Sequence, residues 1–261
     1  TQYSPVELAA VGRSLLLLGM NKGGLPVGSS AIPRLVMVWP SQSNAARGAV
    51  GFMLPMLSMM DIVAVTLYRK EIQWRKLSHI LPGSLVGVAI ASALFVSEHN
   101  ALVAVSDKAL KVAIGLLGLV FVLYFATRKW ILKKLHHAVE PNWTAGTGYG
   151  IVAGITSTLA HAAVPVMQMY LLPQHLPKLR FAATMAAYFF ILNFVKMIPF
   201  TLMGRIQPDN LKLGLVMLPV LPLGVILGHF LVKRTKQHHY VGFIYTVLFI
   251  TSIVLILKAL V

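Results

Sequence analysis

The sequence predicts an all-α integral membrane protein made of two inverted repeats, each a broken helical hairpin followed by three transmembrane helices. Three observations predict this class. Of the 261 residues, 57% are hydrophobic and 11% are charged, whereas a soluble domain carries about 25% charged residues. Apolar runs close to the roughly 20 residues that span the hydrocarbon core recur along the chain. The two halves also resemble each other, which indicates a duplication.

The first apolar segment, residues 6–39, is interrupted by "GMNKGGLPVG" at residues 19–28. Its two arms, 6–19 and 29–39, would reach about 21 and 16 Å as helices. Neither arm spans about 30 Å of hydrocarbon. We therefore expect a hairpin that enters and leaves on one side, although two short crossings would give every later loop the same sidedness.

Uninterrupted apolar runs follow, and a second interrupted segment at 144–172 divides them into two sets of three. The six runs predicted to cross the membrane are 48–68, 79–96, 110–127, 181–203, 211–232 and 241–257. Within them, "LPGSLVGV" (81–88) resembles "LPVLPLGV" (218–225). We predict three parts of the chain, which are a first membrane repeat over 1–127, a basic cytoplasmic linker over 128–143 and a second membrane repeat over 144–261.

The distribution of basic residues predicts the orientation. Three crossings in each half would invert the second half relative to the first, as in many transporters. More than half of the 23 Lys and Arg residues then lie in loops on one side, at 69–76, 128–137, 178–180 and 233–236. The side richer in Lys and Arg is the cytoplasmic side of a cell (inner or plasma) membrane. Both termini are therefore predicted to be extracytoplasmic.

The two interruptions predict an anion site. Irregular backbone at membrane depth must be buried in protein or line a watery cavity. A helix beginning near Gly28 would point backbone N–H groups and its positive dipole end at an anion. The candidate anion-binding residues of the first interruption are Asn21, Lys22, Gly23 and Gly24. The second interruption (154–166) offers hydroxyls from Thr156, Ser157 and Thr158 and the imidazole of His161, before Pro165 restarts a helix.

Two further charges lie within apolar runs, Asp61 and Lys196, and Asn193 is one helical turn from Lys196. A charge near the bilayer centre usually faces the bundle interior and has a function. We include Asn193 and Lys196 among the anion ligands, and Asp61 and His161 as candidate proton carriers. Each residue also has a structural interpretation: Lys22 could pair with Asp61 for stability alone, and His161 and Asn193 could serve packing.

Other classes fit the sequence poorly. The chain has no cysteine, so disulfides, thiolate metal sites and cysteine nucleophiles are excluded. No Ser/His/Asp spacing or HExxH motif is present, and seven acidic residues in all leave little for an enzyme. The net charge of +16 lies between membrane segments rather than on one soluble face, which argues against nucleic acid. We expect no metal and no cofactor; the expected partners are a small anion, protons and the lipid bilayer, with a homodimer left open.

Three stretches resemble the TauE/SafE family of membrane anion exporters: residues 19–28, 54–88 and 154–181, the last being the most specific. The resemblance implies export of sulfite or small organosulfonates, driven by the proton gradient. It leaves open another small anion such as sulfate or a carboxylate, uptake instead of export, and a passive channel. Members of the family often have a Gly-Gly pair after the histidine, where this chain has Ala163 and Val164. The added side chains would narrow the cavity or bar close approach of the backbone to a ligand.

Overall fold

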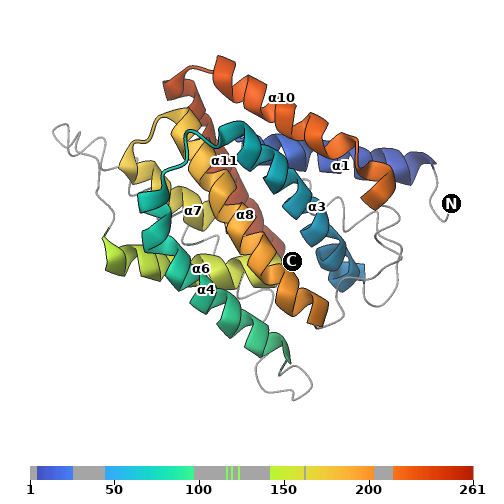
Figure 1. Ribbon diagram of the computed structural model, residues 1–261, viewed down its shortest axis with the longest axis horizontal. Helices are drawn as coiled ribbons and strands as arrows, with labels where there is room; N and C mark the ends of the chain where they lie inside the picture. The colour runs from blue at the N-terminus through green and yellow to red at the C-terminus, as the bar shows by residue number, and fades with distance from the viewer. Residues whose placement is uncertain are drawn as a thin grey trace. The chain divides into compact units, whose positions relative to one another are not determined.

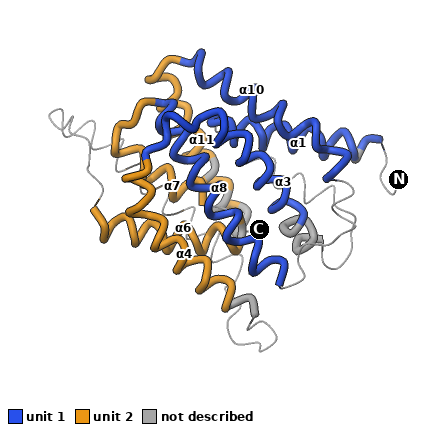
Figure 2. The backbone as a smooth tube through the Cα atoms, in the orientation of Figure 1, with its two compact units in different colours: residues 1–73, 178–235 blue, residues 74–177, 236–261 orange. Residues whose placement is uncertain are grey.

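The computed structural model describes residues 5–25, 45–96, 142–161, 163–202 and 214–260, with residues 116, 119 and 123 standing alone. Regular structure in these ranges is helical throughout (Figure 1). Two compact units divide the chain, unit 1 with residues 1–73 and 178–235 and unit 2 with 74–177 and 236–261 (Figure 2). Each unit therefore combines segments from both predicted repeats, whose boundaries stay a prediction.

The long helices in the described part of unit 1 are α1 (Pro5–Lys22), α3 (Ala45–Tyr68), α8 (Lys178–Leu202) and α10 (Val220–Arg234). The runs predicted at 48–68 and 181–203 are confirmed as α3 and α8. α3 begins three residues earlier than predicted, and α8 likewise includes basic residues at its start. Long basic side chains can extend to water while their stems cover apolar surface, so a helix continues past the end of its apolar run.

Unit 2 contains α4 (Trp74–Val96), α6 (Trp143–Ala160), α7 (Val164–Leu171), the short 3₁₀ helix η3 (Leu172–Gln174) and α11 (Gln237–Leu260). The runs predicted at 79–96 and 241–257 are confirmed within α4 and α11. The run predicted at 110–127 lies outside the described residues, apart from the three isolated positions.

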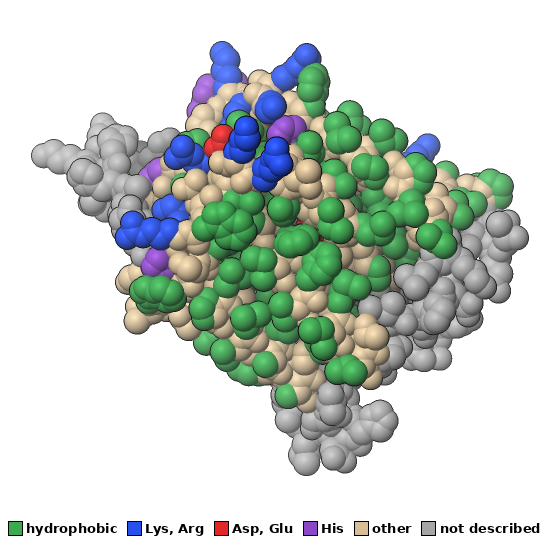
Figure 3. Space-filling view, viewed as in Figure 1, with side chains coloured by type: hydrophobic (Ala, Val, Ile, Leu, Met, Phe, Trp, Pro, Cys, Tyr) green, Lys and Arg blue, Asp and Glu red, His purple; other side chains and the backbone are tan. Residues whose placement is uncertain are grey.

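Several helices have the length and composition of membrane spans. Within the described residues these are Trp74–Ala93, Lys178–Leu202 and Gly214–Arg234, with a shorter apolar helix at Phe52–Tyr68. Their outer faces are apolar, as Figure 3 shows over much of the visible surface. The exposed side chains of α10 include Leu223, Ile226, Leu227, Phe230 and Leu231. Such a face would be unfavourable in water and suits a lipid environment.

Glycines hold α1 against α10 in unit 1. A Cβ atom added to Gly19 would lie 2.9 Å from the Cα of Gly224, and one on Gly23 would overlap the backbone of Val225 and Gly228. The two helices therefore run parallel and in close backbone contact, side by side in Figure 1. Both carry the GxxxG spacing of close helix pairs in membranes, at 19–23 and 224–228.

Close backbone contact at glycines also occurs between α4 and α6 in unit 2. A Cβ atom on Gly154 would lie 2.9 Å from the backbone nitrogen of Val88, and one on Gly150 would lie 2.8 Å from that of Ser84. Gly83 and Gly87 of α4 approach α6 as closely. This pair also runs parallel, so each unit contains one parallel helix pair whose backbones meet at glycines.

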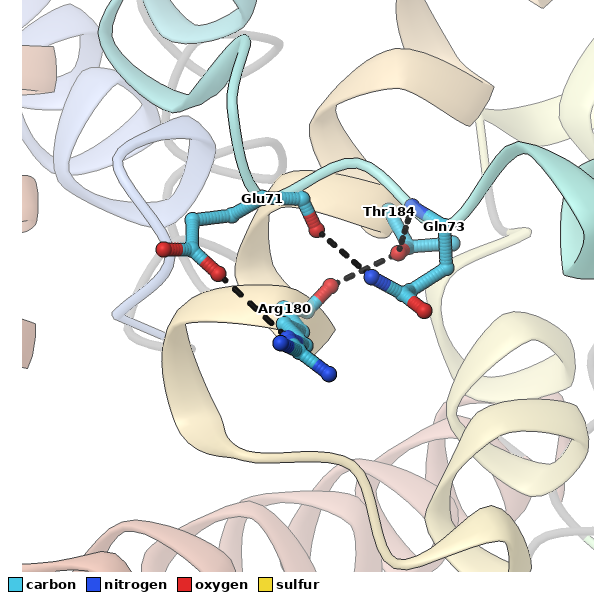
Figure 4. A network of polar contacts seen from close by, with 4 residues as sticks. All are labelled: Glu71, Gln73, Arg180 and Thr184. Carbon is cyan, nitrogen blue, oxygen red and sulfur yellow. Dashed lines mark hydrogen bonds and ion pairs between the residues drawn. The ribbon is translucent and has the colours of Figure 1, made fainter.

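The basic loops gather at one end of unit 1. The segment after α3 packs against the first two turns of α8, where Gln73 N–H donates to Thr184 Oγ1 (3.2 Å) and Arg180 Nε lies 3.5 Å from Glu71 Oε2 (Figure 4). Lys178 Nζ donates to Lys233 O (2.8 Å) at the end of α10. The end of α3, the start of α8 and the end of α10 therefore lie together, as the predicted sidedness of these loops requires.

The second interrupted segment is a hairpin. α6 ends at Ala160, His161 turns the chain in the left-handed conformation (φ 50°, ψ 31°), and α7 returns. The rings of Tyr149 in α6 and Tyr170 in α7 lie 5.8 Å apart, so the two arms run side by side. Tyr170 Oη donates to Lys76 O (2.9 Å) in the first turn of α4. This turn carries Arg75 and Lys76 and is the basic end of unit 2, so the end of α7 lies there.

The first interrupted segment differs from the prediction. Its first arm was expected over 6–19, about 21 Å long, but α1 continues to Lys22 and contains 18 residues, or about 27 Å. Asn21 and Lys22 therefore lie in the last helical turn and not in irregular backbone. The reason is local: neither side chain stops a helix, and a cation is favourable near a helix C-terminus. The second arm, 29–39, and Gly28 lie outside the described residues.

Candidate anion-binding site

Asp61 is the centre of a buried polar cluster in unit 1. Its carboxylate is fully buried: Lys22 Nζ forms an ion pair with Oδ1 at 2.7 Å, and Asn193 Nδ2 donates a hydrogen bond to Oδ2 at 2.6 Å. These three side chains come from three helices, α3, α1 and α8. The Lys22–Asp61 pair of the structural interpretation is present, and Asn193 contacts the same carboxylate; a role of these residues in binding an anion stays a prediction.

Lys196 adds a second cation to this cluster. It follows Asn193 by one turn of α8, its side chain is fully buried, and it lies within electrostatic reach of both Lys22 and Asp61. Apart from Glu7 at the start of α1, Asp61 is the only carboxylate in the described helices. The cluster therefore contains two lysines and one aspartate.

The cluster lies inside the apolar part of unit 1. Asp61 precedes the end of α3 at Tyr68 by seven residues, which is about 10 Å along the helix. The amine of Lys22 lies 4.6 Å from the centroid of the Phe189 ring, where the ring face attracts a cation. The Lys22 side chain is 11% exposed and that of Asp61 is 0% exposed, so Lys22 forms the accessible edge of the cluster.

Gly23 and Gly24 end α1 beside this cluster. Gly24 has a φ of +101°, which side chains other than glycine rarely adopt. Tyr68 Oη donates to Gly23 O (2.7 Å), and the ring of His229 meets the Tyr68 ring edge to face, with centroids 4.5 Å apart. The end of α1 is therefore fastened to α3 and packed against α10.

Sequence reasoning missed Tyr68 and His229, although one signal was available. His229 is a polar residue inside the apolar run 211–232, the criterion that selected Lys196. Its Nδ1 is buried and has no hydrogen-bond partner among the described residues. Sequence reasoning also missed the GxxxG pairs, which are visible in the printed sequence.

The candidate residues of the second interruption lie in unit 2, at the end of α6. Thr156 and Ser157 are buried, and the N–H of His161 donates to the carbonyls of both. The hydroxyls of Thr156 and Thr158 donate to carbonyls one turn earlier in α6, at 2.8 Å in each case. An anion accepts hydrogen bonds, so these hydroxyls could bind an anion only after rotating away from the carbonyls of their own helix.

Ala163 and Val164, which replace the Gly-Gly pair common in the resembling family, adopt ordinary helical backbone. Ala163 has φ −80° and ψ −10° at the start of α7, a conformation open to any residue. The left-handed turn is made two residues earlier, by His161. Ala163 is fully buried, so its methyl group fills space that a glycine would leave.

The structure thus divides the candidate residues between the units. Unit 1 brings Lys22, Asp61, Asn193 and Lys196 together beside Gly23 and Gly24, with Asn21 in the adjacent turn, and unit 2 holds Thr156, Ser157 and His161. That the two interruptions form one site stays a prediction.

Apolar helices of membrane-spanning length, a helical hairpin and a buried charge cluster are typical of helical membrane transport proteins. Comparison with protein families agrees. The model of the family "Sulfite exporter TauE/SafE" matches residues 15–255. The chain therefore belongs to the TauE/SafE family. No curated protein and no solved structure matches it.

Proposed function

We propose that this protein exports a sulfite- or sulfonate-like anion across the cell membrane as a proton-coupled secondary transporter that works by alternating access. The buried cluster of Lys22, Asp61, Asn193 and Lys196 is the observation that carries the proposal. Burying charge in an apolar bundle is costly, so two lysines buried around one aspartate are typical of an anion pathway. Membership in a family named for sulfite export supports the choice of a sulfur oxyanion.

The helix pairs support an inverted duplication. α1 packs parallel to α10, and α6 packs parallel to α4. In the sequence repeat, α1 corresponds to α6, because each opens one half, and α4 corresponds to α10, because Gly87 and Gly224 are 137 residues apart. Each opening helix therefore packs against a helix of the other half. A pair of duplicated halves related by a twofold axis would produce this exchange.

The direction of the two opening helices supports the same plan. α1 runs toward the basic end of unit 1, because Gly12 lies near Met217 whereas Gly24 lies near Val232, close to Lys233 and Arg234. α6 starts at the basic end of unit 2, where the rings of Trp143 and His79 lie 4.5 Å apart, and runs away from it. If both basic ends are cytoplasmic, the two helices enter from opposite sides and the N-terminus is extracytoplasmic.

The rest of the mechanism follows from these parts. The anion would bind at Lys22 and Lys196, with Asn193 and the backbone near Gly23 and Gly24 as hydrogen-bond donors. Thr156, Ser157 and His161 would complete its ligands from the second interruption. Asp61 or His161 would take up the coupling proton. Rocking of the two repeats would expose the site to each side in turn.

Flux in proteoliposomes tests this proposal. Purified protein would be reconstituted, loaded with sulfite or a small sulfonate, and given a proton gradient in either direction. We expect saturable flux that follows the direction of the gradient and slows when a protonophore collapses it. Liposomes without the protein are the control, and they measure how fast sulfite crosses the bilayer as its neutral acid.

Flux that ignores the gradient would contradict proton coupling and indicate a channel or an uncoupled carrier. Flux of neither anion would contradict the assignment of a sulfur oxyanion, while the membrane fold would stand.

A further inference from the structure

The outer face of α10 carries an exposed apolar stripe that ends in a cation. Its exposed side chains recur at the helical spacing of three and four residues, and they are Leu223, Ile226, Leu227, Phe230, Leu231 and Arg234. The residues between them include the buried Gly224, Val225, Gly228 and Val232. Because α10 belongs to the candidate span Gly214–Arg234, this stripe faces lipid and Arg234 lies where the headgroups begin.

The guanidinium of Arg234 lies against the stripe itself. Its Cζ atom is 4.1 Å from the centroid of the Phe230 ring, one turn earlier in α10, where the ring face attracts a cation. Phe230 is 47% exposed. Charge and apolar surface are therefore presented to a ligand at the same place.

Further cations of unit 1 gather at this end of α10. Lys178 Nζ donates to Lys233 O (2.8 Å) and to Thr235 O, which joins the start of α8 to the end of α10. Arg180, also in the first turn of α8, lies 3.5 Å from Glu71 (Figure 4). Within the described residues of unit 1, Glu71 is the one carboxylate at this end. Four cations of the two helix ends thus face a single carboxylate, which leaves an excess of positive charge.

We propose that this end of unit 1 binds an anionic phospholipid, with the headgroup phosphate at Arg234 and Lys233 and an acyl chain along the exposed stripe of α10. A planar guanidinium presents N–H donors that match the oxygens of a phosphate, and clusters of Lys and Arg beside a membrane helix attract anionic lipids. The inference does not depend on the proposed anion transport.

Other occupants match this surface less well. A soluble anion would use the charge of Arg234 and leave the apolar stripe unused. A second copy of the chain, packed through the same stripe in the same membrane, would bring two basic ends together, and like charges repel. An anionic lipid uses both the charge and the stripe.

Lipid binding to the purified protein in detergent tests the inference without a transport assay. The probes are dioleoylphosphatidylglycerol and dioleoylphosphatidylcholine, which have the same acyl chains and differ in net charge. Native mass spectrometry counts the lipids bound at each lipid concentration. We expect phosphatidylglycerol to bind at least about fivefold more tightly, because one basic residue near the headgroups contributes about that factor. Equal binding of the two lipids would overturn the inference, whatever the variants do.

Substitutions of Arg234 locate the site. Arg234→Gln should weaken phosphatidylglycerol binding by about fivefold and leave phosphatidylcholine binding unchanged, whereas Arg234→Lys keeps the charge and should retain most of the binding. Arg13→Gln is the control, because Arg13 is an exposed arginine of α1 in the same unit, nine residues before Lys22 at the end of that helix. Equal losses in Arg13→Gln and Arg234→Gln would overturn the site, because they would mean that charge anywhere on the surface suffices.

Two further outcomes test the choice of occupant. Inorganic phosphate, added at the concentration of lipid that saturates the site, should not displace phosphatidylglycerol, and displacement would overturn the lipid in favour of a free anion. The same spectra report the number of protein chains in each complex. A dimer that carries no phosphatidylglycerol would overturn the inference and assign the stripe to a second copy.

Discussion

The ends of α1 and α6 invite comparison because the two helices are alike in form and unlike in chemistry. Each has 18 residues, packs in parallel against a partner helix through glycines, and ends at a left-handed residue, Gly24 or His161. The end of α1 lies beside two lysines and an aspartate. The end of α6 instead carries hydroxyls and an imidazole.

Under the proposed duplication, the two helices share the close glycine packing but not the charged side chains. Close glycine packing fixes where each helix ends, and this depends on shape alone. The net charge needed to hold an anion is required only once in a bundle, because a second set of buried charges would add cost without a ligand to balance it. We therefore expect full charges at the first interruption to govern affinity, and the second interruption to tune orientation and coupling.

The largest effect should come from Lys22→Met. This change leaves Asp61 buried with a hydrogen bond from Asn193 but without its ion-pair partner, and removing one partner of a buried pair costs about 3–5 kcal/mol. We expect anion flux to fall below detection and the thermal unfolding midpoint in detergent to drop.

Lys70→Met is the matched control, because Lys70 is exposed. The double variant Lys22→Met with Asp61→Asn separates stability from transport. It should regain the unfolding midpoint without regaining flux, and restored flux would contradict a direct role of Lys22 in binding the anion.

Gly23→Ala should have the next largest effect. The new methyl group would overlap the Val225 carbonyl oxygen and lie 2.8 Å from the backbone nitrogen of His229, and forcing extra volume into a packed contact costs about 1–3 kcal/mol. Gly12→Ala, in the same helix, is the control, since its nearest neighbour would be Met217 Sδ at 3.8 Å. Thermal unfolding should distinguish the two variants, and equal midpoints would contradict the close packing of α1 on α10.

The contrast between the two interruptions shows what the sequence could predict. Apolar runs predict the helices because burial in lipid depends on composition. A charged residue inside such a run is unfavourable in free energy wherever it lies, and this criterion selects Lys22, Asp61 and Lys196. The sequence predicts the end of α1 three residues too early, because a glycine such as Gly19 is typical of a helix end. Its lack of a side chain instead serves the contact with Gly224.

Contacts between distant segments were harder to predict. The hydrogen bond from Tyr68 to Gly23 joins residues 45 positions apart, and no local pattern marks it. The donors of Thr156 and Thr158 were counted as free for a ligand, but a threonine inside a helix readily bonds its own backbone.

His161→Asn should separate the roles of the two interruptions. Asparagine tolerates the left-handed backbone at this position better than most residues, so α6 and α7 should still form a hairpin. If His161 carries the coupling proton, flux should remain within about tenfold of wild type but lose its dependence on the proton gradient. His239→Asn, at an exposed site, is the control. Retained coupling would assign the proton to another group, with Asp61 the next to test.

Tyr68→Phe should have the smallest effect, and it tests how the first interruption is fastened. The change removes only the hydroxyl that donates to Gly23 O at 2.7 Å and keeps the ring against His229, and losing one such hydrogen bond costs about 1 kcal/mol. A slightly lower unfolding midpoint is therefore expected in Tyr68→Phe, whereas Tyr149→Phe in unit 2 should match wild type. If the end of α1 moves during transport, this bond breaks in each cycle, and its loss should alter the maximal rate more than the apparent affinity. A change in affinity alone would instead mean that Tyr68 acts on the anion site by positioning Lys22, which precedes Gly23, the residue whose carbonyl accepts the hydrogen bond from Tyr68.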